Sequence, residues 1–486
     1  MANETNIFAE LIAHCKEYGY IFQSSEIYDG LSAVYDYGQN GAQLKKNIRD
    51  YWWKSMTQIH DNIVGIDAAI FMHPTTWKAS GHVDNFSDPM IDNKDSNKRY
   101  RVDHLIEGFA ETLDAATGKT ILDNMDALLA ADDYSGLKTL IETNNIKCAV
   151  SKTCNWTDVR QFNLMFSTEF GAVAADNPDD NKVYLRPETA QGIFVNFLNV
   201  QKTGRMKIPF GIAQTGKAFR NEIVARQFIF RMREFEQMEM QFFIRPGSQM
   251  EWYNYWKEER KAWHESLGIP AEKLRFHDHV KLAHYADAAL DIEFEFPFGW
   301  KELEGIHSRT DFDLSQHQKF SKKKIQYFDN DLNDEGKPIG NYTPYVLETS
   351  VGLDRLFLTI MSLAYTNETW TKEDGTADSR VVLKIPAKIA PTKLAILPLV
   401  KKDGLPEIGI VLMNECKGSF MCFYEEKDAI GKRYRRMDAI GTPFCVTIDH
   451  QTKEDNMVTI RYRDTMVQER IAIADVKKIV LEKTSW

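Results

Sequence analysis

The stretch "REFEQMEMQFF", residues 233–243, places three glutamates and two glutamines among Phe and Met side chains. We predict a β-strand here, because alternate residues of a strand point to opposite faces. One face carries Arg233, Phe235, Gln237, Glu239 and Gln241, and the other carries Glu234, Glu236, Met238, Met240 and Phe242. Neither face is uniformly apolar. The stretch is therefore either an edge strand with two wet faces or a strand with one face in a polar, aromatic-lined site.

Length and composition bound the class of protein. The chain has 486 residues, of which 43% are hydrophobic, and this predicts about three domains with large cores. A net charge of −10 argues against a protein that coats nucleic acid without specificity, but it leaves room for a local basic face. The six cysteines favour a reducing compartment. With no secretion signal and no run of about eighteen apolar residues, we expect a cytoplasmic protein without a membrane partner.

Periodicity predicts the main elements. Residues 41–60 have apolar side chains at helical spacing, and 65–74 read as an apolar strand. Segments 210–223 and 233–243 are closely spaced strands, which predicts an antiparallel pair. Residues 342–365 read as a strand, a turn at Gly352 and an apolar helix.

Other segments predict the domain organisation. Residues 91–145 look like a surface insertion, 315–341 like an exposed excursion, and 366–380 like a boundary or mobile loop. Beyond residue 380, short apolar strands alternate with helical stretches, which predicts a separate α/β domain. The strands are expected at 393–400, 409–424, 443–450 and 457–463.

Four segments carry charged groups where apolar residues would pack better. They are RPETAQ (186–191), FRNEI (219–223), RMREFEQMEM (231–240) and LETSVGLDR (347–355). Each arginine taken alone is more often part of a surface ion pair. Two arginines beside an aromatic face, however, suit a polyphosphate next to a flat base. Arg355 would lie in the first turn of a helix after Gly352, where anions bind readily.

Longer motifs resemble one family. FRNEI with RMREFEQME (231–239) resembles motif 2 of class II aminoacyl-tRNA synthetases, and SVGLDR (350–355) before an apolar helix resembles their motif 3. The dimeric glycyl-tRNA synthetases are similar at YDYGQNGAQLKKNIRDYWW (35–53), ASGHVDNFSDPM (79–90), TDVRQFNLMF (157–166), RPETAQGIF (186–194) and SRTDFDL (308–314). The resemblance covers nearly the whole chain.

This resemblance implies an α+β fold and an activity. Residues 1–380 would form a class II catalytic domain, an antiparallel sheet flanked by helices, with the insertion near 91–145 and the loop near 315–341. Residues 381–486 would form an α/β anticodon-binding domain. The implied reaction is ATP-dependent ligation of glycine to tRNA(Gly) through glycyl-adenylate. Its substrates would be glycine, ATP and tRNA, with Mg²⁺ accompanying ATP.

The resemblance also implies the site residues. Arg220 would hold the α-phosphate of ATP, Glu222 would recognise the adenine amino edge, and Arg355 would hold the γ-phosphate, so catalysis would depend on these three. Phe235 would stack on the adenine, and Glu302 would lie at the ATP and its Mg²⁺. The set implied for ATP is Arg220, Asn221, Glu222, Phe230, Arg231, Arg233, Phe235, Glu302, Leu303, Arg309, Gly352, Asp354 and Arg355. The set implied for glycine is Arg101, Glu188, Phe235, Gln237, Glu239, Glu348 and Ser350.

Two kinds of protein are alternatives to a glycine enzyme. A non-catalytic paralogue could keep the fold and bind nucleic acid, but Arg220, Glu222 and Arg355 are all present. Another class II synthetase, such as one for proline, threonine or serine, would hardly retain three glutamates around the ammonium. Some relatives carry a zinc knuckle near this site. Cys148 and Cys154 alone do not make a four-ligand site, so no structural zinc is expected.

A homodimer is implied by the motif 1 region. The helix around Trp52 and Trp53 and the segment leading to Pro89 correspond to the part that builds the class II dimer. The alternative is that the tryptophans fill the core of a monomer.

GKRYRRMD (431–438) is the basic run expected to bind tRNA. It places four basic side chains beside Tyr434, which suits phosphate contacts and base stacking. In isolation such a run is more often a solvated helix face, but its place in the last domain of a synthetase-like chain reverses that preference. The residues expected to bind tRNA are Lys432, Arg433, Arg435 and Arg436.

Overall fold

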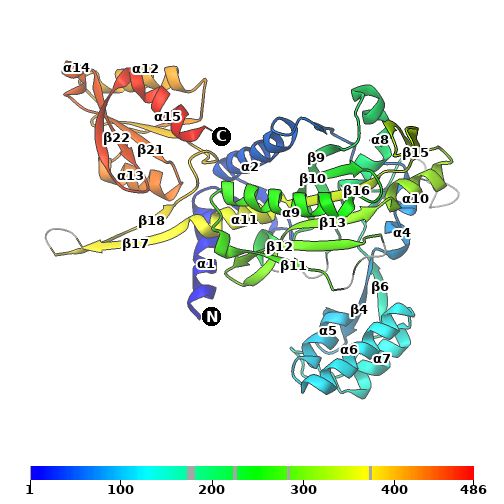
Figure 1. Cartoon of the computed structure of the whole chain (residues 1–486). Coiled ribbons are helices and arrows are strands. Elements are labelled where there is room, and N and C mark those ends of the chain that lie inside the picture. The colour runs from blue at the N-terminus through cyan, green and yellow to red at the C-terminus, as the bar shows by residue number, and fades with distance from the viewer. Residues whose placement is uncertain are drawn as a thin grey trace.

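The largest element of the chain is a seven-stranded sheet. Figure 1 shows it in the computed structural model, which describes residues 2–171, 181–222, 227–280, 282, 285–371 and 375–485. The strand order is β11-β12-β13-β16-β10-β9-β3, and every neighbouring pair is antiparallel except β3 with β9. The strands are β3 (Ile63–Gly65), β9 (Phe210–Phe219), β10 (Glu234–Ile244), β11 (Leu274–Asp278), β12 (Ala288–Phe296), β13 (Gly299–Thr310) and β16 (Tyr345–Gly352).

Helices pack on both faces of this sheet. Met238 and Met240 of β10 lie in the main core with Trp52 of α2, on one face. On the other face, Phe243 of β10 packs against Phe197 of α8, with ring centroids 4.6 Å apart. The helices are α1 (Ala2–Glu17), α2 (Gln39–Thr57), α9 (Gln249–Ser266) and α11 (Leu353–Ala364) beside the main core, and α8 (Ala190–Gly204) and α10 (Phe312–Ser321) on the other side.

The opening stretch forms β10, which confirms the strand prediction. β10 lies between β16 and β9, so the edge-strand alternative is wrong. Both glutamates on the face that packs against α2 have partners. Glu234 pairs with the exposed Lys217 at 2.8 Å, and the buried Glu236 binds Arg49 at 2.8 Å and Lys45 at 3.4 Å. The opposite face is therefore the one available for a site.

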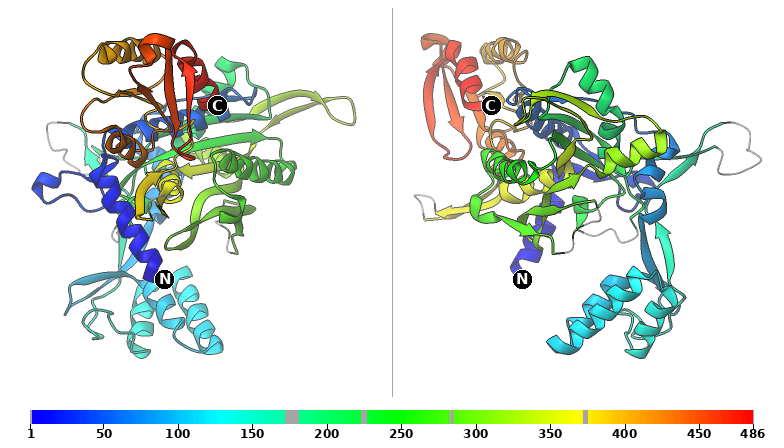
Figure 2. Two further views of the ribbon diagram at one scale, coloured as in Figure 1. Left: turned by 90° about the vertical axis from the view of Figure 1, so that its left-hand side faces the viewer. Right: turned by 45° about the vertical axis from the view of Figure 1, so that its right-hand side comes forward.

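The inserted segment folds as a unit with its own core. A three-stranded sheet in the order β5-β4-β6 carries three helices, and this unit projects away from the large sheet in Figure 2. Its core extends from Ile91 to Val159, beyond the range 91–145. The elements are β4 (Ser87–Asn93), β5 (Lys98–Arg101), α5 (Val102–Ala110), α6 (Ala115–Ala130), α7 (Tyr134–Thr143) and β6 (Arg160–Asn163).

The C-terminal part is a five-stranded mixed sheet in the order β20-β19-β21-β22-β23 with its own core. The buried Asp438 joins it to the preceding hairpin by binding Arg380 at 2.7 Å and Arg461 at 2.8 Å. His14 and Tyr20 join it to the N-terminus, since they contact the carbonyls of Ala439 and Ile440. The elements are β19 (Leu394–Pro398), α12 (Leu405–Cys416), β20 (Cys422–Tyr424), α13 (Ile430–Ala439), β21 (Phe444–Ile448), α14 (Thr452–Asp455), β22 (Met457–Tyr462), β23 (Gln468–Ala472) and α15 (Val476–Thr484).

Short elements complete the described chain. They are β1 (Ile21–Gln23), β2 (Tyr35–Tyr37), α3 (Pro74–Ala79), α4 (His82–Asn85), β7 (Ser167–Glu169), β8 (Lys182–Tyr184), β14 (Tyr327–Leu332), β15 (Pro338–Tyr342), β17 (Tyr365–Thr371) and β18 (Ala377–Leu383). Within the part of the chain that the structure describes, no helix has the length and apolar character needed to cross a membrane.

The strand expected at 65–74 is wrong. β3 ends at Gly65, and α3 begins at Pro74. Between them, the Ile66 N–H donates to the Ala213 carbonyl of β9, and Phe71 forms an isolated bridge with Leu185. The carbonyl of Ala68 accepts a 2.8 Å hydrogen bond from Arg186, so a side chain satisfies a backbone group that a neighbouring strand would otherwise pair.

Three further segments differ from expectation. Residues 366–380 form most of the β17–β18 hairpin rather than a loop, although 372–374 lie outside the described residues. Part of 409–424 belongs to helix α12, because a short apolar run has no period that separates helix from strand. The segment 315–341 begins inside α10 and only then forms an exposed hairpin. Residues 223–226, at the end of the strand expected over 210–223, also lie outside the described residues.

Candidate active site

The polar face of β10 meets polar residues of its neighbours in register. Glu239 lies opposite Ser350 of β16, and Gln241 lies opposite Glu348. His307 of β13 lies opposite Glu348 on the other side of β16. Three strands therefore gather carboxylate, amide and imidazole groups at one place in the sheet.

Three carboxylates converge there. Glu239 and Glu348 are only 2% and 5% exposed, and the amide of Gln241 donates to both, at 2.8 Å and 2.7 Å. Glu188, in the turn before α8, accepts from Gln191 at 3.0 Å and lies 3.4 Å from His82. Burial of three acidic groups at one point is costly unless a cation or a proton compensates.

Arg309 supplies part of this compensation. Its buried guanidinium binds Glu348 at 3.0 Å and Asp313 at 2.8 Å. The guanidinium also lies 4.3 Å from the centre of the Tyr285 ring, within cation–π distance. One arginine therefore does not balance three glutamates and an aspartate, and the pocket keeps an excess of acidic groups.

The acidic groups have divergent pKa values. Burial raises the pKa of Glu239 well above its usual range, and the nearby Glu348 and Glu188 raise it further. Burial also acts to raise the pKa of Glu188, but His82 and Arg309 outweigh it and lower the pKa to about 2. The pKa of Glu348 is likewise lowered, because Arg309 and His307 overcome the effect of burial. Of the three carboxyl groups, Glu239 is therefore the one whose ionised form the pocket favours least in the absence of a cation.

A cavity of 230 Å³ lies beside this acidic pocket, at the ends of β10 and β16. It brings together most of the residues implied for ATP and three of those implied for glycine, Phe235, Gln237 and Ser350. The lining residues are Arg220, Glu222, Ile229, Phe230, Arg231, Met232, Phe235, Glu236, Gln237, Glu302, Ser350, Gly352, Asp354 and Arg355.

Two arginines line the cavity, and each is held by its own partners. Arg355 lies in the first turn of α11, where it binds Glu302 at 2.8 Å and lies over the Phe230 ring at 4.5 Å. Arg220 donates to the carbonyl of Pro187 at 3.1 Å, and its guanidinium lies 5.4 Å from the centre of the Phe235 ring. The arrangement offers two cationic groups and a flat apolar face to one ligand.

A buried ionic cluster supports the floor of the cavity. Asp354 accepts hydrogen bonds from the Lys45 ammonium at 2.6 Å, from the Glu236 backbone N–H at 2.7 Å and from the Tyr37 hydroxyl. These donors take up its carboxylate, so Asp354 positions the start of α11, and with it Arg355, rather than offering a ligand group.

Several implied ATP residues are not in this cavity. Arg233 donates to the carbonyls of Glu222 and Ser32, so it fixes loops instead. Leu303 faces the main core because it alternates with Glu302 along β13. The side chains expected in the cavity but absent from its lining are Asn221, Arg233, Leu303 and Arg309, the last of which belongs to the acidic pocket.

Arg101 is not brought to the acidic pocket. It pairs with Asp88 at 3.2 Å and with Asp103, and it lines a second cavity of 640 Å³ between the inserted unit and the sheet. This larger cavity shares the lining residues Glu222, Phe230 and Arg231 with the smaller one, so the two are neighbours.

The basic run of the C-terminal part forms helix α13, and its arginines are already engaged. Arg433 is 1% exposed and donates to the carbonyls of Pro398, Glu425 and Leu399. It is therefore a structural residue and not a tRNA contact. Arg435 pairs with Asp378 and Arg436 with Asp428 at the surface, while Lys432 is exposed.

Sequence reasoning missed several side chains of the site. Thr189 donates to Glu239, and Gln241 bridges two of the carboxylates. Asp313 holds Arg309, and His307 lies 2.8 Å from Glu348. Gln241 shares the face of Glu239 in the alternation, and His307 stands two residues before Arg309, so both signals were present in the sequence.

An antiparallel sheet that carries these cationic and acidic groups beside an α/β C-terminal domain defines a class II aminoacyl-tRNA synthetase. Two family models agree: an anticodon binding domain matches residues 393–483, and the glycyl-tRNA synthetase insertion domain 1 matches residues 88–122 and 113–164. The glycine–tRNA ligase of Chlorobaculum tepidum is 52% identical over 98% of this chain and 99% of its own length. Those of Treponema denticola and Staphylococcus haemolyticus are 49% and 47% identical, covering 95% and 98% of this chain and 94% and 98% of their own lengths. The chain belongs to the glycine–tRNA ligase family.

Proposed function

We propose that this chain ligates glycine to tRNA(Gly) at the expense of ATP, through a glycyl-adenylate. The observation that carries the proposal is the convergence of Glu188, Glu239 and Glu348 beside a cavity lined by Arg220 and Arg355. The acidic pocket suits a small ammonium, and the arginine-lined cavity suits a nucleoside triphosphate. A carboxylate placed between them is the nucleophile that the reaction needs.

Glycine selection follows from exclusion. The substrate has no side chain, so a pocket recognises it by holding the ammonium and filling the space where a side chain would stand. Gln241 and Thr189 occupy the pocket around Glu239 and hold its carboxylate oxygens in place. An added methyl group would then meet fixed polar atoms, and this discriminates more strongly than a missing contact.

The ATP roles follow from the cavity. Phe235 offers its ring to the adenine, and Glu222 lies where it can accept from the adenine amino group. Arg220 is assigned to the α-phosphate and Arg355 to the γ-phosphate. Glu302 is ionised because Arg355 lowers its pKa, and an anionic oxygen at this position fits a hard cation such as Mg²⁺. Bound Mg²⁺ would neutralise charge on the phosphate oxygens.

No general base is needed for the first step. The glycine carboxylate is already ionised at neutral pH, and one of its oxygens attacks the α-phosphorus while pyrophosphate leaves. Arg220 and Arg355 contribute by positioning two anions and stabilising the charge that develops. In the second step a terminal ribose hydroxyl of tRNA attacks the glycyl carbonyl, and AMP leaves.

The remaining assignments concern the macromolecular partners. Residues from about 388 to 486 are assigned to the anticodon, with Lys432, Arg435 and Arg436 as phosphate contacts that exchange their present partners for RNA. The active species is assigned as a cytoplasmic homodimer. The interface is assigned, as the motif 1 resemblance implies, to the helix around Trp52 and Trp53 and the segment leading to Pro89. Trp52 is fully buried within one chain, whereas Trp53 is only partly buried.

ATP–pyrophosphate exchange with each of the twenty amino acids tests the proposal. Exchange is expected with glycine alone. Exchange with another amino acid would refute the specificity, and a folded protein without any exchange would refute the activity. Sedimentation at micromolar concentration tests the dimer, and a monomer with full activity would overturn it.

A further inference from the structure

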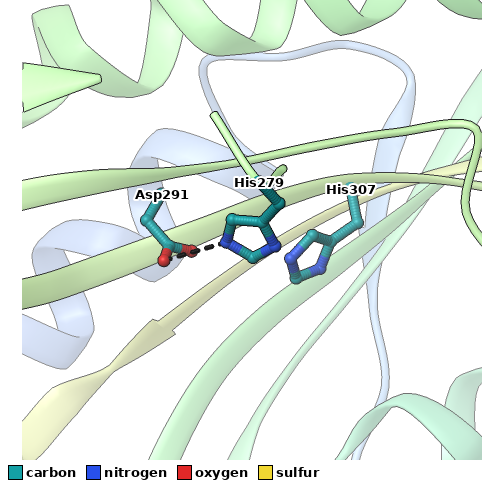
Figure 3. Close-up of side chains that lie close together, drawn as sticks. All are labelled: His279, Asp291 and His307. Atoms are coloured by element: carbon teal, nitrogen blue, oxygen red, sulfur yellow. Dashed lines mark ion pairs between the residues drawn. The ribbon is translucent and has the colours of Figure 1, made fainter. Parts of the chain in front are cut away.

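A second cluster of ligand groups lies at the β11 edge of the large sheet. His279 follows β11, Asp291 is on β12 and His307 is on β13, three neighbouring strands. Figure 3 shows the side chains in a row, with His279 between the other two. Among the described residues this is the group in which three His, Cys, Asp or Glu side chains come close enough to share a metal ion.

The distances suit one small cation. One nitrogen of each imidazole and one oxygen of the carboxylate all lie within 4.8 Å of one another, and His279 Nε2 is 3.0 Å from Asp291 Oδ2. Ligand atoms about 2.0–2.1 Å from a tetrahedral Zn²⁺ are about 3.3 Å apart. Small side-chain rotations would therefore replace the direct His279–Asp291 contact by two metal bonds.

The backbone keeps this place open. Gly305 lies opposite Asp291 in the β12–β13 pair. A Cβ atom at Gly305 would meet His307 Cε1 at 3.0 Å and Asp291 Oδ1 at 3.7 Å. Glycine at this position thus leaves space between the two ligand groups. The cluster also borders a cavity of 250 Å³, lined by His279, Tyr285, Ala286, Ala289, Asp291, Glu302 and His307.

We propose that His279, Asp291 and His307 form a binding site for a divalent transition metal ion of the Zn²⁺ type. Two imidazoles and one carboxylate are a donor set that such ions prefer, whereas Mg²⁺ prefers oxygen ligands. The adjoining cavity provides room for water or a substrate atom in the remaining coordination position. Its ligands differ from the residue assigned to Mg²⁺ and ATP, Glu302, which lines both the ATP cavity and the cavity beside this cluster.

His307 connects this site to the acidic pocket. Its Nδ1 lies 2.8 Å from Glu348 Oε1, so Nε2 is the nitrogen that faces a metal. Metal on Nε2 fixes the tautomer in which Nδ1–H donates to Glu348, the arrangement in which a carboxylate orients a metal-bound histidine. If the proposed function of Glu348 holds, metal occupancy also changes the apparent affinity for glycine.

Direct metal binding tests the site without reference to activity. Full-length protein freed of metal with a chelator is titrated with Zn²⁺ by calorimetry, in the absence of ATP, and the bound Co²⁺ form is examined by visible absorption. We expect about one ion per chain and no binding of Mg²⁺ at the same concentrations. His279→Gln and Asp291→Asn should each weaken Zn²⁺ binding about tenfold or more, since even loss of an outer partner costs that much.

A matched control comes from the same chain. His450 and Asp403 form a comparable ion pair at 3.0 Å in the C-terminal part, so His450→Gln makes the same change away from the cluster and should leave Zn²⁺ binding unchanged. Zn²⁺ should also raise the Tm of the wild type and of His450→Gln, but not that of His279→Gln or Asp291→Asn. Absence of stoichiometric binding to the wild type, or full binding to both cluster variants, would overturn the site. Glycine-dependent exchange that fails while Zn²⁺ binds normally would count against the proposed function alone.

Discussion

Replacement of Glu239 by glutamine is expected to weaken glycine binding about ten- to hundredfold. Glu239 is almost fully buried, and it already accepts hydrogen bonds from Thr189 and Gln241. The substrate ammonium would be a further donor, and such a charge-assisted hydrogen bond contributes about 1.5–3 kcal/mol. Glutamine preserves the volume but removes the charge, and its own NH₂ group must face one of these donors. The ATP cavity does not include this carboxylate, so ATP affinity should change little.

Steady-state ATP–pyrophosphate exchange measures both effects, through the KM for glycine and the KM for ATP. Glu234→Gln is the matched control, because it makes the same change on the same strand, at a partly exposed residue that pairs with Lys217. Circular dichroism and Tm establish that each variant is folded. A folded Glu239→Gln protein with an unchanged KM for glycine, or with both KM values raised equally, would refute the assignment of this strand.

Three further predictions follow from the same site and from α13. Phe235→Ala should raise the KM for ATP about five- to hundredfold and leave the KM for glycine nearly unchanged, because stacking on a base contributes roughly 1–3 kcal/mol. An unchanged KM for ATP would show that the Phe235 ring does not stack on the adenine. Glycine binding should release a proton and tighten as pH rises toward the raised pKa of Glu239, since the ammonium lowers that pKa and favours the ionised carboxylate. Calorimetry in two buffers of different ionisation enthalpy measures the number of protons released. Proton release that persists in Glu239→Gln would show that Glu239 is not the source. Lys432→Ala should raise the KM for tRNA severalfold and lower the salt dependence of tRNA binding by about one charge. ATP–pyrophosphate exchange should not change. Unchanged tRNA binding would exclude this face of α13 as a tRNA contact.

The alternation in residues 233–243 correctly predicted a strand, because alternation follows from local geometry. It also placed Glu239 on the face that became the acidic pocket. The alternation could not show how Glu236 is compensated, since its partners Arg49 and Lys45 come from a helix nearly two hundred residues earlier in the chain. Long-range ion pairs of this kind leave no periodic signal.

The roles of single arginines were harder to predict. Arg433 lies on the same face of α13 as Met437, which follows one turn later, and both side chains are buried. From the sequence alone, an arginine at such a position is predicted to be solvated. Only the folded structure shows the carbonyl oxygens that accept its hydrogen bonds. Arg233 is similar, because its partners are backbone carbonyls whose direction only the folded loops define.

The hydrogen bonds of His14 and Tyr20 have a consequence for how the chain is made. Their partners, the carbonyls of Ala439 and Ile440, come 425 and 420 residues later. At about 5–20 residues per second, a ribosome needs roughly 20 to 85 seconds to cover that interval. Throughout this time the first helix has been synthesised, but the surface that covers it has not. The two ends of the molecule therefore close together only near the end of synthesis, and a product halted before residue 439 differs from the finished protein at its opposite end.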